Sequence, residues 1–396
     1  MSKFRRMMCF LLSVVAFACL LPLPGAAQEI ALASEAAVLM DAESGQILYG
    51  KNMDSTMYPA SITKVLTGLL ALKYAKETDK VTMTQVGVSQ VPRTSSHIAL
   101  EPGEAFTMKD ALYALALVSA NDAAVAIAET VSGSVEDFAK LMNEEAEKLG
   151  AYNTHFVNPN GMPNQDHYTT ARDMALITAE ALKQEGFLTY FGAKSYEMPA
   201  TNLSAPRPLV SKNQFIDGTF DCPGLLMSKT GWTSSALGTL VTAVKRGDTT
   251  LIAVTLKSPM LEDKYTDTLA LLDYGFANYR RVRLSQKLME RKMVAQGMDE
   301  DCSLEGYTPQ DVLIPQTAGE ADIAVTVPGG FDSSLGVSTV PASVDVKQED
   351  GTWVHVTDLL LTILDPEPEV EALAETEGAE ATAETEAKAI HPGAAI

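Results

Sequence analysis

The chain has 396 residues, of which 46% are hydrophobic, and its formal net charge is −21. This length exceeds one ordinary domain, so we expect a large unit with a sizeable core and a smaller additional one. The acidic charge argues against a nucleic-acid partner, because nothing offsets repulsion from phosphates, and it weakens electrostatic attraction to an anionic membrane.

The first residues are typical of an export signal. A basic start precedes an apolar stretch over residues 7–21, which is short for a membrane span, and small residues follow at 25–27 and 31–33. We expect residues 1–33 to be a signal peptide and the mature protein to lie outside the cytoplasm. An uncleaved anchor is the alternative. Lipidation at Cys19 is disfavoured, because Phe17 stands where a small residue is usual.

The mature chain then keeps two cysteines, Cys222 and Cys302. One disulfide between them would suit an oxidising compartment, but free, partly buried cysteines are at least as well supported.

The expected elements begin with a β-hairpin over residues 36–49 and an apolar run of helical spacing that places Ser61 near a helix start. Helical patterns follow over residues 108–150 and 172–182. Two strands around a turn at 246–248 predict a second hairpin, and a helix with apolar residues at 269, 272 and 276 comes next. This order predicts an α+β fold with helices packed on an antiparallel sheet.

Composition suggests how the chain divides. We expect a main domain over residues 34–280, then a small β-rich domain over residues 284–364, where short alternating runs lie between Gly, Pro and Asp clusters. Residues 365–396 are rich in Ala, Glu and Thr and predict a disordered acidic tail.

Three short polar clusters carry the chemistry. In the first, Ser61 and Lys64 are three residues apart and share one face of a helix. A serine hydroxyl is a weak nucleophile until a base takes its proton, and a lysine can do so if burial and a nearby cation lower its pKa. Lys229 is the expected cation. The helix start offers backbone N–H groups that can hold an oxyanion.

The second cluster, Ser119-Ala120-Asn121, lies between two helical runs. Ser119 can pass a proton to a leaving amine, and Asn121 can accept from a lysine and donate to a substrate carbonyl. In the third cluster, Lys229 and Thr230 open a strand and can hold a terminal carboxylate. Gly231 removes side-chain bulk, so that an extended peptide can lie alongside.

The first two clusters, taken singly, have a simpler explanation, because Ser61 fits a helix N-cap and Ser119 a loop cap. Ser211-Lys212-Asn213 repeats the second pattern and carries no evident role. A Ser-His-Asp triad would use a serine in a Gly-x-Ser-x-Gly motif, and no histidine occurs in such a context. His97, His155 and His167 are therefore expected at the surface or in caps. No metal-ligand spacing is present and no cofactor is expected.

Taken together and in order, the clusters resemble those of a low-molecular-mass penicillin-binding protein, a serine-type D-alanyl-D-alanine carboxypeptidase with a β-lactamase/transpeptidase-like fold. The resemblance covers roughly residues 34–280, with a β domain where the family often has one. Beyond the clusters it includes these segments: 36–45, 58–64, 102–104, 118–124, 156–162 and 170–175.

The resemblance implies specific roles. Ser61 would be the acylated nucleophile with Lys64 as its base, and Ser119 and Asn121 would relay protons and position substrate. Lys229 and Thr230, beside Gly231, would bind the terminal carboxylate. The backbone N–H groups of Ser61 and Trp232 would form the oxyanion hole. The expected substrate is a peptidoglycan stem peptide ending in D-Ala-D-Ala, and β-lactam antibiotics would be covalent inhibitors.

Three departures from the family pattern stand out: Ser228 replaces a commoner apolar residue, Leu237 replaces glycine, and the tail lacks a basic amphipathic helix. Three alternatives to the carboxypeptidase remain: a DD-endopeptidase that cuts cross-links, a class A-like β-lactamase, and a wall-binding protein without activity. The β-lactamase is disfavoured because no Glu-x-x-x-Asn lies between Asn121 and Lys229.

Overall fold

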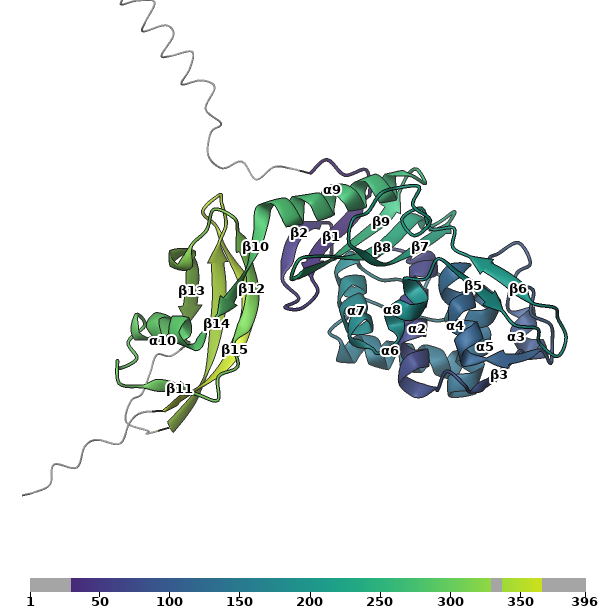
Figure 1. Cartoon of the computed structure of the whole chain (residues 1–396), viewed down its shortest axis with the longest axis horizontal. Coiled ribbons are helices and arrows are strands. Elements are labelled where there is room, and N and C mark those ends of the chain that lie inside the picture. Colours follow the sequence, from purple (N-terminus) through teal and green to yellow (C-terminus); the bar gives the residue numbers. More distant parts are fainter. Residues whose placement is uncertain (1–29, 329–336, 365–396) are drawn as a thin grey trace, which may run out of the picture.

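The computed structural model describes residues 30–328 and 337–364, and Figure 1 shows two parts joined after helix α9. The expected signal peptide, residues 1–33, lies outside the described residues except for its last four positions. The expected acidic tail over residues 365–396 lies wholly outside them. Among the described helices, none combines the length and apolar character that crossing a membrane requires.

The larger part is built on a five-stranded sheet in the order β2-β1-β9-β8-β7, in which every neighbouring pair is antiparallel. This confirms the expected α+β class. The strands are β1 (Ala36–Asp41), β2 (Ile47–Lys51), β7 (Leu225–Thr233), β8 (Leu237–Arg246) and β9 (Thr249–Ser258). Strand β7 lies at one edge, so the backbone groups on its outer side face no further strand of this sheet.

Both faces of the sheet are buried, because the central strands are apolar at consecutive positions. Alternate side chains such as Val241 and Val254 join the core beneath the helices, whereas their neighbours Leu240 and Ala253 pack with Leu272 of α9 (Asp263–Asn278) on the opposite face. The sheet is thus a middle layer, with α9 on one side (Figure 1).

The helices on the other face come from the middle of the chain and form a largely alanine- and leucine-lined core. They are the 3₁₀ helix η1 (Ala60–Thr63), α2 (Lys64–Tyr74), α3 (Gln85–Ser89), α4 (Met108–Leu117), α5 (Asn121–Ser132), α6 (Val135–Lys148), α7 (Ala171–Lys183) and α8 (Phe187–Phe191). Two small antiparallel pairs complete this part: β3 (Lys80–Thr82) with β4 (Ala105–Thr107), and β5 (Ser195–Met198) with β6 (Arg207–Val210).

The smaller part has its own hydrophobic core, formed by residues between 284 and 363. Its sheets are β10 (Tyr279–Leu284) with β12 (Gln310–Pro315), and β11 (Ser303–Glu305), β15 (Trp353–Leu364), β14 (Val337–Lys347) and β13 (Ile323–Thr326) in that order. It also contains helix α10 (Gln286–Val294) and the 3₁₀ helix η2 (Glu320–Asp322), which the sequence pattern did not suggest. The expected domain limits stay a prediction.

The two parts are connected by polar contacts beside the linking strand β10. Arg281 donates to Asp41 at 2.7 Å and to Glu43 at 2.9 Å. The Gln46 side chain donates to the carbonyl of Leu313 and accepts from its N–H, at 2.7 and 2.9 Å. The first β-hairpin therefore rests on the smaller part. Cys222 and Cys302 are buried in different cores.

Candidate active site

The structure brings the three clusters together where η1, the start of α5 and strand β7 meet. Ser61 lies within η1, directly before α2, and Lys64 is the first residue of α2. Neither serine is a helix cap: the caps of η1, α2 and α5 are Pro59, Thr63 and Ala120, and none makes a side-chain capping hydrogen bond. The capping explanation of Ser61 and Ser119 therefore does not hold.

Lys64 is completely buried, and three oxygen atoms surround its amine. Nζ lies 2.9 Å from Ser61 Oγ, 2.7 Å from Asn121 Oδ1 and 2.5 Å from the backbone carbonyl of Asn160. A neutral amine has two N–H bonds and one lone pair, and the amide and carbonyl oxygens can only accept. These two oxygens take both N–H bonds, so the lone pair faces the Ser61 hydroxyl.

The surroundings of Lys64 favour this neutral form. Burial holds the pKa of Lys64 well below its usual value, the charge of Lys229 lowers it further, and Asp122 opposes the shift. The cation that the sequence analysis expected beside Lys64 is thus in place.

Ser119 connects the helices with the sheet. It lies between α4 and α5 at φ +58°, and its Oγ accepts from Lys229 Nζ at 2.9 Å. Lys229 also donates to the carbonyl of Thr230 at 2.7 Å. Burial and the charge of Lys264 lower the pKa of Lys229 to about 7. Near neutral pH this amine can therefore both carry charge and exchange a proton with Ser119.

Gly231 is required by the approach of β7 to the nucleophile segment. A Cβ at this position would lie 2.8 Å from the backbone nitrogen of Ser61 and 2.3 Å from Thr239 Oγ1. The glycine lets the strand come close to the Ser61 N–H. The next residue, Trp232, is 58% exposed and stands at the rim of the site.

Four residues near the site had no role in the sequence analysis. Asn160 acts through its backbone carbonyl, which no side-chain pattern reveals. Lys264, at the start of α9, is 5% exposed and acts on Lys229 through its charge. Asn213 is buried and donates to Ser228. The expectation of a surface or capping role is wrong for His167, which is 1% exposed and contacts Thr63. The residue before it is Asp166, so the local sequence gave no sign of burial.

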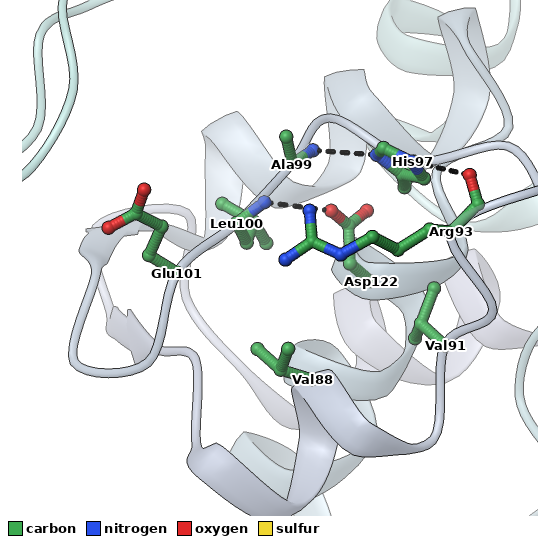
Figure 2. A pocket seen from close by; sticks show the side chains of 8 residues that line it. All are labelled: Val88, Val91, Arg93, His97, Ala99, Leu100, Glu101 and Asp122. Atoms are coloured by element: carbon green, nitrogen blue, oxygen red, sulfur yellow. Dashed lines mark hydrogen bonds between the residues drawn. The ribbon is translucent and has the colours of Figure 1, made fainter.

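Asp122 holds the loop that borders the second cluster. Its carboxylate accepts from the backbone N–H groups of Ile98 and Leu100, at 3.1 and 3.0 Å, in addition to its place in the first turn of α5. Figure 2 shows this carboxylate in the wall of a cavity of about 110 Å³, which Arg93 and His97 also line. Ser61 and Lys64 do not line this cavity. No group of potential metal ligands occurs among the residues that the structure describes.

Residues 24–260, more than half of the chain, match the model of the peptidase S11 family, described as D-alanyl-D-alanine carboxypeptidase. The chain belongs to this family. An S11 relative, D-alanyl-D-alanine carboxypeptidase DacF of Bacillus subtilis, is 37% identical over 259 residues, which are 63% of this chain and 64% of that protein. The chain thus aligns with slightly less than two thirds of that relative.

Solved structures agree with the S11 assignment in fold. Penicillin-binding protein 5 of Haemophilus influenzae aligns with a TM-score of 0.69 at 24% identity, covering 86% of this chain and 99% of that one. A variant of the Streptomyces K15 DD-transpeptidase aligns with a TM-score of 0.58 at 29% identity, covering 62% of this chain and 99% of that one. The alignment with the first structure is long enough to include residues of the smaller part. The alignment with the second is about as long as the larger part alone.

The two departures near the third cluster have distinct structural consequences in this S11 peptidase. Ser228 is buried, accepts from Asn213 Nδ2 at 3.0 Å and lies 2.9 Å from Thr242 Oγ1, so its hydroxyl is satisfied. Leu237 begins β8 at φ +55°, a conformation that favours glycine over residues with a Cβ. The first departure is accommodated by a hydrogen-bond network, and the second leaves local backbone strain.

Proposed function

We propose that this protein is a serine-type D-alanyl-D-alanine carboxypeptidase that removes the terminal D-alanine from peptidoglycan stem pentapeptides. The observation that carries the proposal is the arrangement of Lys64, whose two acceptor-only partners leave its lone pair for the Ser61 hydroxyl 2.9 Å away. Membership of the S11 family supports the same reaction.

In the proposed acylation, Ser61 Oγ attacks the carbonyl of the penultimate D-alanine while its proton moves to Lys64. The developing oxyanion is held by the Ser61 N–H and, by family resemblance, by the Trp232 N–H. The C–N bond then breaks, and the leaving amine of the terminal D-alanine takes a proton through Ser119, whose Oγ accepts from Lys229. An ester of Ser61 remains.

By the end of acylation, Lys64 has passed the Ser61 proton on to the relay that protonates the leaving amine, so Lys64 is neutral again. In deacylation, a water molecule gives one proton to Lys64 and the oxygen of that water attacks the ester carbonyl. The Ser61 oxygen leaves, recovers a proton, and the shortened peptide is released with a new carboxylate. Lys229 and Thr230 are proposed to bind the carboxylate of the terminal D-alanine before the first step. β-Lactams would acylate Ser61 by the same route, because their ring carbonyl is attacked in place of the peptide carbonyl.

The contacts of Lys64 also bear on the β-lactamase alternative. The loop opposite the nucleophile offers Lys64 the backbone carbonyl of Asn160, and none of the hydrogen bonds of Lys64 or Ser61 in the described structure involves a glutamate. This supports slow hydrolysis of a penicillin ester, and therefore a peptidase over a β-lactamase.

The proposed location is outside the cytoplasm, after export by the N-terminal signal. The substrate lies in the cell wall, and the apolar segment with a basic start at residues 1–21 is the feature that supports export.

The test is incubation of the purified protein with a muropeptide pentapeptide and, separately, with a cross-linked dimer, followed by mass spectrometry. We expect loss of one D-alanine from the pentapeptide and little cleavage of the dimer, with no product from Ser61→Ala. Preferential cleavage of the dimer would establish the endopeptidase instead. A folded protein that releases nothing and does not bind a fluorescent penicillin covalently would refute both enzymes and favour the wall-binding alternative.

A further inference from the structure

A chain of hydrogen bonds connects His167 with the peptide bond that precedes Ser61. Nδ1 of the buried imidazole accepts from the N–H of Val157 at 3.1 Å, so a neutral ring must carry its single proton on Nε2. That Nε2 lies 2.9 Å from Thr63 Oγ1 and donates to it. The Thr63 hydroxyl in turn donates to the carbonyl of Ala60 at 2.8 Å. Each group in this chain has one defined role as donor or acceptor.

The last acceptor in the chain belongs to the peptide unit that contains the Ser61 N–H. A peptide group is planar, and in its trans form the C=O and N–H point in opposite directions. A hydrogen bond that fixes the Ala60 carbonyl therefore also fixes the direction of the Ser61 N–H. This N–H lies at the side of β7, since a Cβ on Gly231 would come within 2.8 Å of the Ser61 nitrogen.

This peptide unit needs an external restraint. Ala60 has φ +51°, which is unfavourable for a residue with a Cβ and persists only where the surroundings enforce it. The neighbouring backbone is close as well: a Cβ on Gly161 would lie 1.9 Å from the Ala60 oxygen and 3.0 Å from Thr63 Oγ1. The carbonyl before it, on Pro59, accepts from Thr239 Oγ1 at 2.9 Å. Two threonine hydroxyls thus hold two successive carbonyls before the nucleophile.

We propose that His167 and Thr63 are positioning residues for the oxyanion hole, which act by directing the Ser61 N–H toward the oxygen that becomes negative in the transition state. The proposal rests on the proposed role of Ser61 as the nucleophile. The hydrogen bond on the Ala60 carbonyl also polarises the same peptide unit, which makes its N–H a stronger donor. Neither side chain touches the substrate.

The charge state of His167 is compatible with this role. Burial, His155 and Lys64 lower the pKa of His167 to about 3, so the ring is neutral near neutral pH. The Nδ1 acceptor and the Nε2 donor are therefore both retained during catalysis.

The test compares Thr63→Val, which keeps the shape but removes the hydroxyl, with Thr63→Ser, which keeps the hydroxyl. Two quantities are measured: the second-order rate constant for acylation by a fluorescent penicillin, and the affinity for a peptide boronic acid whose tetrahedral adduct mimics the oxyanion. We expect Thr63→Val to lose about ten- to a hundredfold in both, below or near the effect of deleting one oxyanion donor. Thr63→Ser should stay within about threefold of the parent, because it keeps the donor.

A second pair makes the test independent of Thr63. His167→Leu removes both hydrogen bonds of the ring, whereas His167→Gln keeps an amide donor and an acceptor, so we expect the glutamine variant to retain more acylation and more boronate affinity. This pair decides the question if Thr63→Val does not fold.

The proposal is overturned if Thr63→Val is acylated as fast as Thr63→Ser. It is also overturned if the loss of acylation in Thr63→Val equals the unfolded fraction measured by circular dichroism while the boronate affinity is unchanged. A failure of the proposed function would look different, because the parent protein itself would then carry no penicilloyl group on Ser61 by peptide mapping.

Discussion

Lys229 lowers the pKa of Lys64 by its charge, although the two residues lie on different elements and 165 positions apart in the sequence. The effect adds to that of burial. The cation that is proposed to bind the substrate carboxylate therefore also disfavours protonation of Lys64, the proposed base. This coupling gives the first prediction.

Lys229→Met should raise the pKa of Lys64, because a repelling charge is removed. The rate of acylation by penicillin falls at low pH when Lys64 becomes protonated, so the acid limb of the pH profile should move to higher pH. The measurement is the acylation rate constant across the pH range, with Thr230→Val as a control that leaves the lysines intact. An acid limb at the same pH in both variants would contradict the coupling.

Lys264→Met should affect the opposite limb. The charge of Lys264 contributes to lowering the pKa of Lys229 to about 7, so removing it should raise that pKa. Lys229 then stays protonated to higher pH, and the alkaline limb of kcat/KM should move upward. The pH profile of D-alanine release checks this, and a shift to lower pH would show that the sign is wrong.

Gly231→Ala should abolish most acylation while the protein stays folded. The added methyl would lie 2.8 Å from the Ser61 nitrogen, so β7 and the nucleophile segment must separate. We expect a loss of about two orders of magnitude, comparable with loss of an oxyanion donor. Gly319→Ala is the matched control, because a Cβ there meets no atom within 4 Å. Equal acylation rates in the two variants would refute the close approach.

Ser228→Ala should reduce stability with little effect on acylation. The change leaves the buried amide of Asn213 and the hydroxyl of Thr242 without this partner, at a cost of about 1–3 kcal/mol. Urea unfolding of Ser228→Ala, Thr242→Val and the double variant measures it. Because the two hydroxyls share one hydrogen bond, the double variant should lose less than the sum of the single losses; strict additivity would argue against the network.

Leu237→Gly should lose little stability or gain some, whereas Leu237→Val should lose about 1–2 kcal/mol. The backbone at this position has a positive φ, which glycine adopts freely and a β-branched residue resists most. Thermal unfolding gives the order of the two variants. If the valine variant melts at the higher temperature, side-chain contacts outweigh backbone strain at this strand start.

The sequence alone predicted much of this protein, because the informative signals were local. Helical spacing after Ser61 and the apolar runs around the turn at 246–248 gave the α+β class, since such patterns depend on neighbours a few residues apart. The three clusters gave the candidate reactive groups because each combines its residue types within four positions. Their joint order then pointed to the peptidase family.

Tertiary structure decided what depends on distant contacts. The sequence placed Ser61 and Lys64 on one helical face, but the Asn160 carbonyl that completes the surroundings of Lys64 comes from a loop and leaves no mark in side-chain identity. His167 looked like a surface residue, and only packing buries it and aims it at Thr63. Periodicity records local geometry, whereas hydrogen bonds between remote segments and the pKa shifts of buried charges arise only once the chain has folded.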